Sequence, residues 1–121
     1  MRKTIVLLCR DEDAQRLRAS VLERAGYYVH QCMSFSDAAT HAARSQMVIA
    51  GHTYTSAEQE DLVSRVHETN PSFHMLCLRF NLIEPKALLH ACQECFASQP
   101  GGSRVFIIQA PRVISWPGKA H

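Results

Sequence analysis

The sequence has 121 residues, of which 46% are hydrophobic and 20% are charged, and its formal net charge is +2 with neutral histidines. This composition is typical of one globular domain and excludes an intrinsically disordered chain. The small, scattered charge does not indicate nucleic acid or an anionic membrane as a partner, and no apolar stretch approaches the ~20 residues that span a bilayer.

The start of the chain superficially resembles a secretion signal, because Arg2 and Lys3 precede the apolar run Ile5–Cys9. The run is too short for the hydrophobic region of a signal peptide, and charged residues follow it at once. The five cysteines are an odd number, which fits free thiols in a reducing compartment better than a disulfide framework. We therefore expect a cytoplasmic protein.

The first predicted elements are a strand and a helix. Thr4–Cys9 is a continuous apolar run, which is typical of a strand covered on both faces. Asp11 or Asp13 then caps a helix, and Gly26 is placed to end it. The apolar residues at helical spacing are Ala14, Leu17, Val21, Leu22 and Ala25.

The middle of the chain continues the alternation. A second strand is predicted over Tyr27–Cys32, followed by a short alanine-rich helix from Ser36 to about Arg44. Met47–Ala50 is a third, buried strand that ends at Gly51. A helix from about Ala57 to Thr69 follows, and Asn70-Pro71 ends it, because proline disfavours helix in the preceding residue.

The last third of the chain is predicted to hold two further strands, Phe73–Leu78 and Arg104–Gln109, with a helix between them. Glu84-Pro85 opens that helix, since proline suits the first turn. Its inward-facing residues are expected to be Leu88, Leu89, Cys92 and Phe96. Residues 84–98 are either the fourth helix or a displaced final helix, in which case one strand–helix unit is missing.

Strands that alternate with helices predict right-handed crossovers and an α/β fold. We expect a doubly wound five-stranded parallel sheet of the CheY-like or flavodoxin-like type over residues 1–110. Residues 111–121 form a C-terminal tail in which Pro111, Pro117 and Gly118 leave little room for a closing helix. The last helix is therefore expected to be missing or replaced by an irregular tail.

In such folds, ligands gather at the carboxyl ends of the strands, near the point where the strand order reverses. The candidate residues at this edge of the sheet are Cys9, Arg10, Asp11, Gly51, His52, Arg79, Phe80, Gln109 and Ala110.

The segments "TIVLLCRDEDAQRLRASVLERAGYYV", "SQMVIAGHTY" and "ETNPSFHMLCLRF" resemble the CheY-like receiver domain of response regulators. The resemblance is good over residues 3 to 80 and loose over 81 to 110. It implies a signalling domain that accepts a phosphoryl group on an aspartate after the third strand. Two acids after the first strand help to hold Mg²⁺, a Thr or Ser follows the fourth strand, and a Lys follows the fifth.

This sequence departs from the receiver pattern at each of these positions. Counted back from Gly26, the acid pair falls on Cys9 and Arg10, and a shift of one residue restores only Asp11 as one acid. The phosphoacceptor position falls on Gly51, and residues 45–56 contain no Asp or Glu. The Thr or Ser position falls on Arg79, and the lysine position falls on Gln109 or Ala110. We therefore predict a degenerate receiver.

The altered edge could still bind a ligand. Arg10 and Arg79, with Cys9, His52 and the amides after Gly51, could hold a small anion, because guanidinium groups match phosphate and carboxylate geometry. The simpler interpretation, which we favour, is that both arginines point to solvent or pair with one of the acids at 11–13.

Three other patterns have a functional and a structural interpretation, and the structural one is favoured in each. Cys92 and Cys95, with His90, could bind zinc or act in redox chemistry, but they lie within a helix and fit its apolar face. The acids at 11–13 could be a residual metal site or a helix start. The seven histidines are dispersed, and only His52 lies at the candidate edge.

The tail carries Val113, Ile114 and Trp116. A sheet face left open by a missing helix would be covered either by this tail or by a second subunit, and both remain open. We predict a receiver-like domain of phosphorelay signalling that is neither an enzyme nor phosphorylated. It acts on a protein partner or as a homodimer, without cofactor, catalytic residue or metal; the alternative is a small-anion or small-ligand sensor around Arg10 and Arg79.

Overall fold

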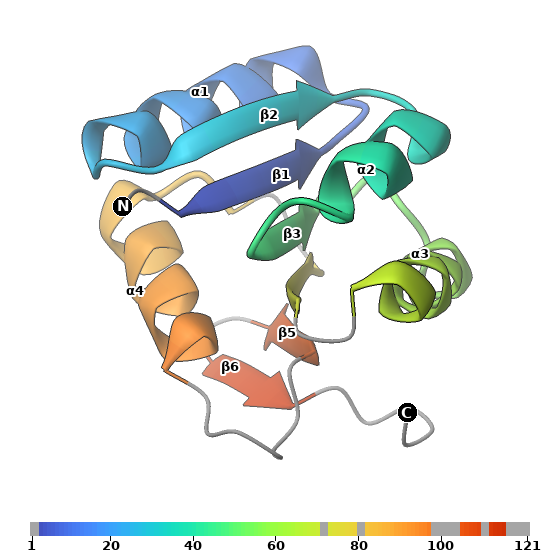
Figure 1. The fold of residues 1–121 in the computed structure, drawn as a ribbon. Coiled ribbons are helices and arrows are strands. Elements are labelled where there is room, and N and C mark those ends of the chain that lie inside the picture. Colours follow the sequence, from blue (N-terminus) through green and yellow to red (C-terminus); the bar gives the residue numbers. More distant parts are fainter. Residues whose placement is uncertain (1–2, 71–72, 80–81, 98–104, 110–111, 116–121) are drawn as a thin grey trace.

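The computed structural model of the protein describes residues 3–70, 73–79, 82–97, 105–109 and 112–115 (Figure 1). Its elements, in chain order, are β1 (Thr4–Leu8), α1 (Glu12–Arg24), β2 (Tyr28–Cys32), α2 (Phe35–Ala42), β3 (Met47–Ala50), α3 (Ser56–Thr69), β4 (His74–Leu78), α4 (Pro85–Phe96), β5 (Val105–Gln109) and β6 (Arg112–Ser115). The predicted elements through β5 are found with ends that differ by at most two residues. No helix in the described part of the chain is long and apolar enough to cross a membrane.

The strands form one sheet in the order β2-β1-β3-β4-β5-β6. The predicted doubly wound arrangement is confirmed for the parallel strands β2-β1-β3-β4 and the four helices around them. β5 pairs with β4 in parallel, and β6 pairs with β5 in antiparallel orientation. The prediction of an irregular tail was therefore wrong for residues 112–115, where strand pairing with β5 satisfies the backbone groups.

The two faces of β1 point into two separate cores. Val6 and Leu8 lie in the core beneath α2 and α3, whereas Ile5 and Leu7 lie in the core beneath α1 and α4. All four side chains are fully buried. A strand covered on both faces needs apolar residues at successive positions, which explains the unbroken run at the start of the sequence.

α4 lies beside α1, on the face of the sheet opposite to α2 and α3 (Figure 1). A right-handed crossover from β4 to β5 would place the connecting helix on the side of α3. The place beside α1 is instead that of a helix following the last strand of a doubly wound sheet. The structure therefore favours the displaced final helix over an ordinary fourth helix for residues 84–98.

α1 is rotated relative to the apolar stripe predicted from its sequence. Leu17 is 52% exposed, whereas Gln15 and Arg18 are buried. The Gln15 amide donates to the carbonyl oxygens of Leu7 (2.9 Å) and Cys32 (2.8 Å). The prediction that Leu17 faces the core was wrong, because the helix directs two long polar side chains toward backbone and side-chain acceptors at the ends of the strands.

Candidate functional site

The three residues after β1 have three different environments. Cys9 is fully buried, and its Sγ accepts from the backbone N–H of Asp11 (3.4 Å). Arg10 is exposed. The Asp11 carboxylate caps α1 by accepting from the backbone N–H groups of Asp13 (3.1 Å) and Ala14 (3.2 Å). Asp11 therefore acts as the helix start that we favoured over a residual metal ligand.

Gly51 follows β3 and lies directly against Cys9. Its N–H donates to the Leu8 carbonyl oxygen at 2.7 Å. A Cβ atom at position 51 would lie 3.0 Å from Cys9 Sγ, 3.1 Å from Cys9 Cβ and 3.0 Å from the Leu8 oxygen. These separations are shorter than ordinary van der Waals contacts. The thiol of Cys9 thus fills the space that a side chain at position 51 would need.

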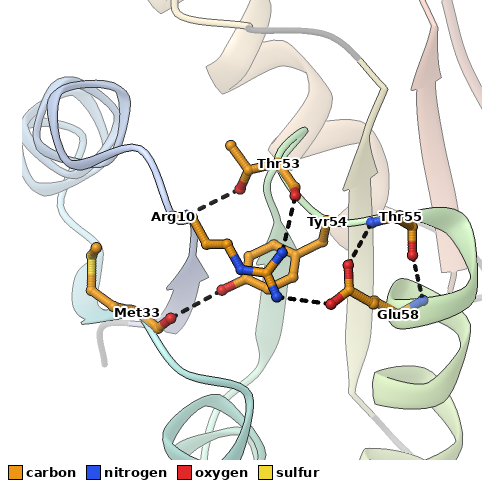
Figure 2. A network of polar contacts seen from close by, with 6 residues as sticks. All are labelled: Arg10, Met33, Thr53, Tyr54, Thr55 and Glu58. Carbon is orange, nitrogen blue, oxygen red and sulfur yellow. Dashed lines mark hydrogen bonds and ion pairs between the residues drawn. The ribbon is translucent and has the colours of Figure 1, made fainter.

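Arg10 spans the gap between the end of β1 and the start of α3, as Figure 2 shows. Its Nη2 lies 2.8 Å from Glu58 Oε2, its Nη1 donates to the Thr53 carbonyl oxygen (3.4 Å), and its guanidinium carbon lies 4.2 Å from the Tyr54 ring centroid. The hydrogen bond with Glu58 raises the pKa of Arg10. Arg10 is exposed, as the first part of the favoured interpretation stated, but its ion-pair partner lies on α3 and not among the acids at 11–13.

The partners of Arg10 are themselves held by hydrogen bonds (Figure 2). Thr55 and Glu58 form a capping box at the start of α3, in which each side chain accepts from the other's backbone N–H. The bond from the Thr55 backbone, followed by the bond from Arg10, lowers the pKa of Glu58. The Tyr54 hydroxyl donates to the Met33 carbonyl oxygen at 3.1 Å. Glu58 therefore supplies Arg10 with an anion from the same chain.

The other candidate residues do not extend an anion pocket. Arg79, which follows β4, donates from Nη1 to Ser56 Oγ in the first turn of α3. Each arginine therefore has a partner on α3. Gln109 is the last residue of β5. Phe80 and Ala110 lie outside the described residues.

Arg18 completes the site, although sequence reasoning did not select it. Its side chain is fully buried. Nε donates to the Leu82 carbonyl oxygen (2.8 Å), Nη1 to Cys9 Sγ (3.4 Å) and Nη2 to His52 Nδ1 (3.3 Å). Arginine in a helix is usually exposed, and the sequence shows no partner within helical spacing, so no local signal predicts this burial.

His52 takes a defined protonation state from this contact. A guanidinium group has donors only, so Nδ1 of His52 must accept and carry no proton. Burial, and then the charge of Arg18, lowers the pKa of His52. His52 therefore is a neutral hydrogen-bond acceptor at this edge of the sheet.

The cysteine pair of α4 lies in the core rather than at this edge. Cys92 and Cys95 are fully buried in the core beneath α1 and α4. Burial raises the pKa of Cys92 to about 12 and raises that of Cys95 further. Thiols in such surroundings are poor nucleophiles and metal ligands. Within the described ranges, no group of three or more His, Cys, Asp or Glu residues is placed to hold a metal ion.

No protein-family model and no curated protein matches the sequence, but solved structures share its fold. A protein described as a response regulator from Chloroflexus aurantiacus has a TM-score of 0.67 and 17% identity, over 81% of this chain and 100% of that one. A response regulator protein from Burkholderia multivorans has a TM-score of 0.61 and 15% identity, over 83% and 99%.

A CheY-like receiver domain protein from Methanospirillum hungatei has a TM-score of 0.63 and 14% identity, over 93% of this chain and 84% of that one. At these identities the likeness shows the fold alone. The chain has the fold of response regulator receiver domains, as the sequence resemblance implied.

The contact between Gly51 and Cys9 predicts coupled effects of substitution. Gly51→Ala should destabilise the protein by about 1–3 kcal/mol, because the new methyl group meets the thiol. The loss should be smaller by about 1 kcal/mol in a Cys9→Ala background. Urea unfolding measures the loss of stability in both backgrounds. Cys92→Ala, which removes a buried thiol elsewhere, is the matched background, and equal losses in all backgrounds would contradict the contact.

The lowered pKa of His52 predicts loss of stability in acid. An unfolded histidine titrates near pH ~6.5. As the pH is lowered through this value, the unfolded state binds a proton at His52 before the folded state does. The free energy of unfolding therefore falls until the pH has passed below the lower, folded-state pKa. Urea unfolding as a function of pH should show this fall in the wild type and its weakening in His52→Gln, which keeps an acceptor. The exposed His67→Gln is the control, and identical pH curves for all three proteins would contradict the prediction.

Proposed function

We propose that this protein is a receiver-like signalling domain that is not phosphorylated after β3 and acts by binding another protein. The observation that carries the proposal is the contact between Gly51 and Cys9. The position that the receiver resemblance assigns to the phosphoacceptor has no side chain, and the thiol of Cys9 occupies the adjoining space. An acyl phosphate needs a carboxylate nucleophile at this place.

The charges at the carboxyl edge support the same proposal. A divalent cation of the Mg²⁺ type needs several oxygen ligands. Here the side chains after β1 are a thiol and a guanidinium, and Arg18 adds a buried guanidinium at Cys9. Two positive charges repel a third at short range. We assign the protein no catalytic residue, metal or cofactor.

The contacts of Arg10 and Arg79 disfavour the alternative of a small-anion sensor. Arg10 is paired with Glu58 and stacked on Tyr54, and Arg79 is bonded to Ser56. An external anion would have to displace the Glu58 carboxylate, which also caps α3. We therefore retain the signalling proposal, and its place in a two-component-type phosphorelay rests on the receiver fold.

A protein partner is supported by the free edge of the sheet. Among the strands that the structure describes, β2 has a neighbour on one side only. Its sequence, YVHQC, contains neither proline nor a Lys, Arg, Asp or Glu, the residues with which sheet proteins commonly block edge pairing. Tyr28, at its start, is 56% exposed, and Met33, just beyond its end, is 46% exposed. A second copy paired along β2 is the partner that this edge fits most simply.

The absence of phosphorylation is testable with a small phosphodonor and Mg²⁺. We expect intact-mass measurement to show no phosphorylated species, because residues 45–56, around the end of β3, contain no carboxylate. A phosphoryl group lost at high pH would contradict the proposal. If such a species appears in the wild type and is absent from Asp11→Asn, the acceptor is Asp11.

Self-association is testable by sedimentation. The wild type should show a concentration-dependent mass that rises toward the dimer. Tyr28→Lys places a charge beside the β2 edge and should shift the mass toward the monomer. Leu17→Lys changes a residue of similar exposure on α1 and should leave the association unchanged. A monomeric wild type at all concentrations would contradict the homodimer and leave a different protein as the proposed partner.

A further inference from the structure

Arg18 joins three segments that are far apart in the sequence. Its hydrogen-bond partners Cys9, His52 and Leu82 lie 9, 34 and 64 positions away. They belong to the end of β1, the loop after β3 and the segment that enters α4. One side chain therefore connects the carboxyl edge of the sheet to the start of α4.

The chemistry of the side chain makes this connection rigid. The guanidinium group is planar, and its N–H groups point in fixed directions, so the three acceptors define one orientation. A buried donor that loses its acceptor finds no water molecule to take the acceptor's place, and this costs free energy. Movement of Leu82 or His52 away from Arg18 is thus unfavourable, and the three segments are held together.

Leu82 extends the effect to α4. Its side chain is 5% exposed and lies in the core that contains Leu22 of α1 and Leu88 of α4. Glu84, two residues later, caps α4 by accepting from the backbone N–H groups of Lys86 (3.3 Å) and Ala87 (2.7 Å). A fixed Leu82 carbonyl therefore fixes the point at which α4 begins.

We propose that Arg18 is a built-in cation that holds the β3–α3 loop and the segment entering α4 against the end of β1, so that α4 keeps one position without a bound metal ion. This goes beyond the proposed function, because it concerns how α4 is held, whether or not the protein is phosphorylated. It assigns Arg18 a positioning role that a side chain buried only for packing would not have.

The test compares amide hydrogen exchange in Arg18→Met and Arg16→Met with that of the wild type. Methionine keeps an unbranched chain as far as the position of the arginine Nε, without donors or charge. Arg16 is an exposed residue of the same helix that pairs with Asp13. We expect the amides of residues 82–92 to exchange roughly tenfold faster in Arg18→Met than in the wild type, after the change in the amides of α3 has been taken into account. Arg16→Met should exchange as the wild type does.

Two outcomes of this comparison would overturn the proposal. One is unchanged exchange over 82–92 in Arg18→Met. The other is an equal increase in α3 and α4, which would mean that Arg18 contributes only to global stability. Adding millimolar Mg²⁺ to the wild type should leave the exchange of α4 unchanged, and a marked slowing would show that the position is not already fixed.

A measurement on the wild type keeps the proposal testable if Arg18→Met does not fold. The Arg18 Nε–H donates to Leu82 in the interior, whereas the Arg16 side chain is exposed. Exchange of the two Nε–H protons with water can be followed by NMR. We expect the Arg18 proton to exchange at least about tenfold more slowly. Equal rates would show that the bond to Leu82 is not maintained and would overturn the proposal.

Discussion

The burial of β1 on both faces is the constraint on which the other features depend. Its alternate side chains enter two cores, one beneath α2 and α3 and one beneath α1 and α4. Neither core can form without this strand, and the strand cannot shift by one residue without exchanging its two faces. The register of β1 against β3 then brings Leu8 opposite Ala50, so Cys9 and Gly51 meet at the carboxyl edge.

The chemistry of that edge differs from the pattern that the receiver resemblance implied. A phosphoryl-accepting site gathers carboxylates and a divalent cation, whereas this edge gathers a thiol, a neutral imidazole and guanidinium groups. The acids near it have other partners: Asp11 caps α1, and Glu58 caps α3 and pairs with Arg10. The negative charge that a cation would need is therefore held in helix caps and an ion pair.

The sequence was sufficient to predict elements governed by local rules. The strands followed from apolar runs, and the Asp11 cap and the first turn of α4 followed from residue types at helix starts. Features decided by distant partners could not be predicted. Arg18 is buried because Leu82, His52 and Cys9 offer acceptors, and Arg10 turns to Glu58 because α3 begins beside β1. β6 depends on pairing with β5, and the place of α4 depends on the path of the chain around the sheet.

The packing of Cys9 on Gly51 also limits which single substitutions this chain can accept. A carboxylate introduced at position 51 meets the thiol, whereas an acid introduced at position 9 would be buried beside the guanidinium group of Arg18. A side chain at position 51 is therefore unfavourable as long as Cys9 keeps its present place. A single substitution that adds a side chain at position 51 therefore gives a less stable protein, and the packing of Cys9 makes glycine the favoured residue there.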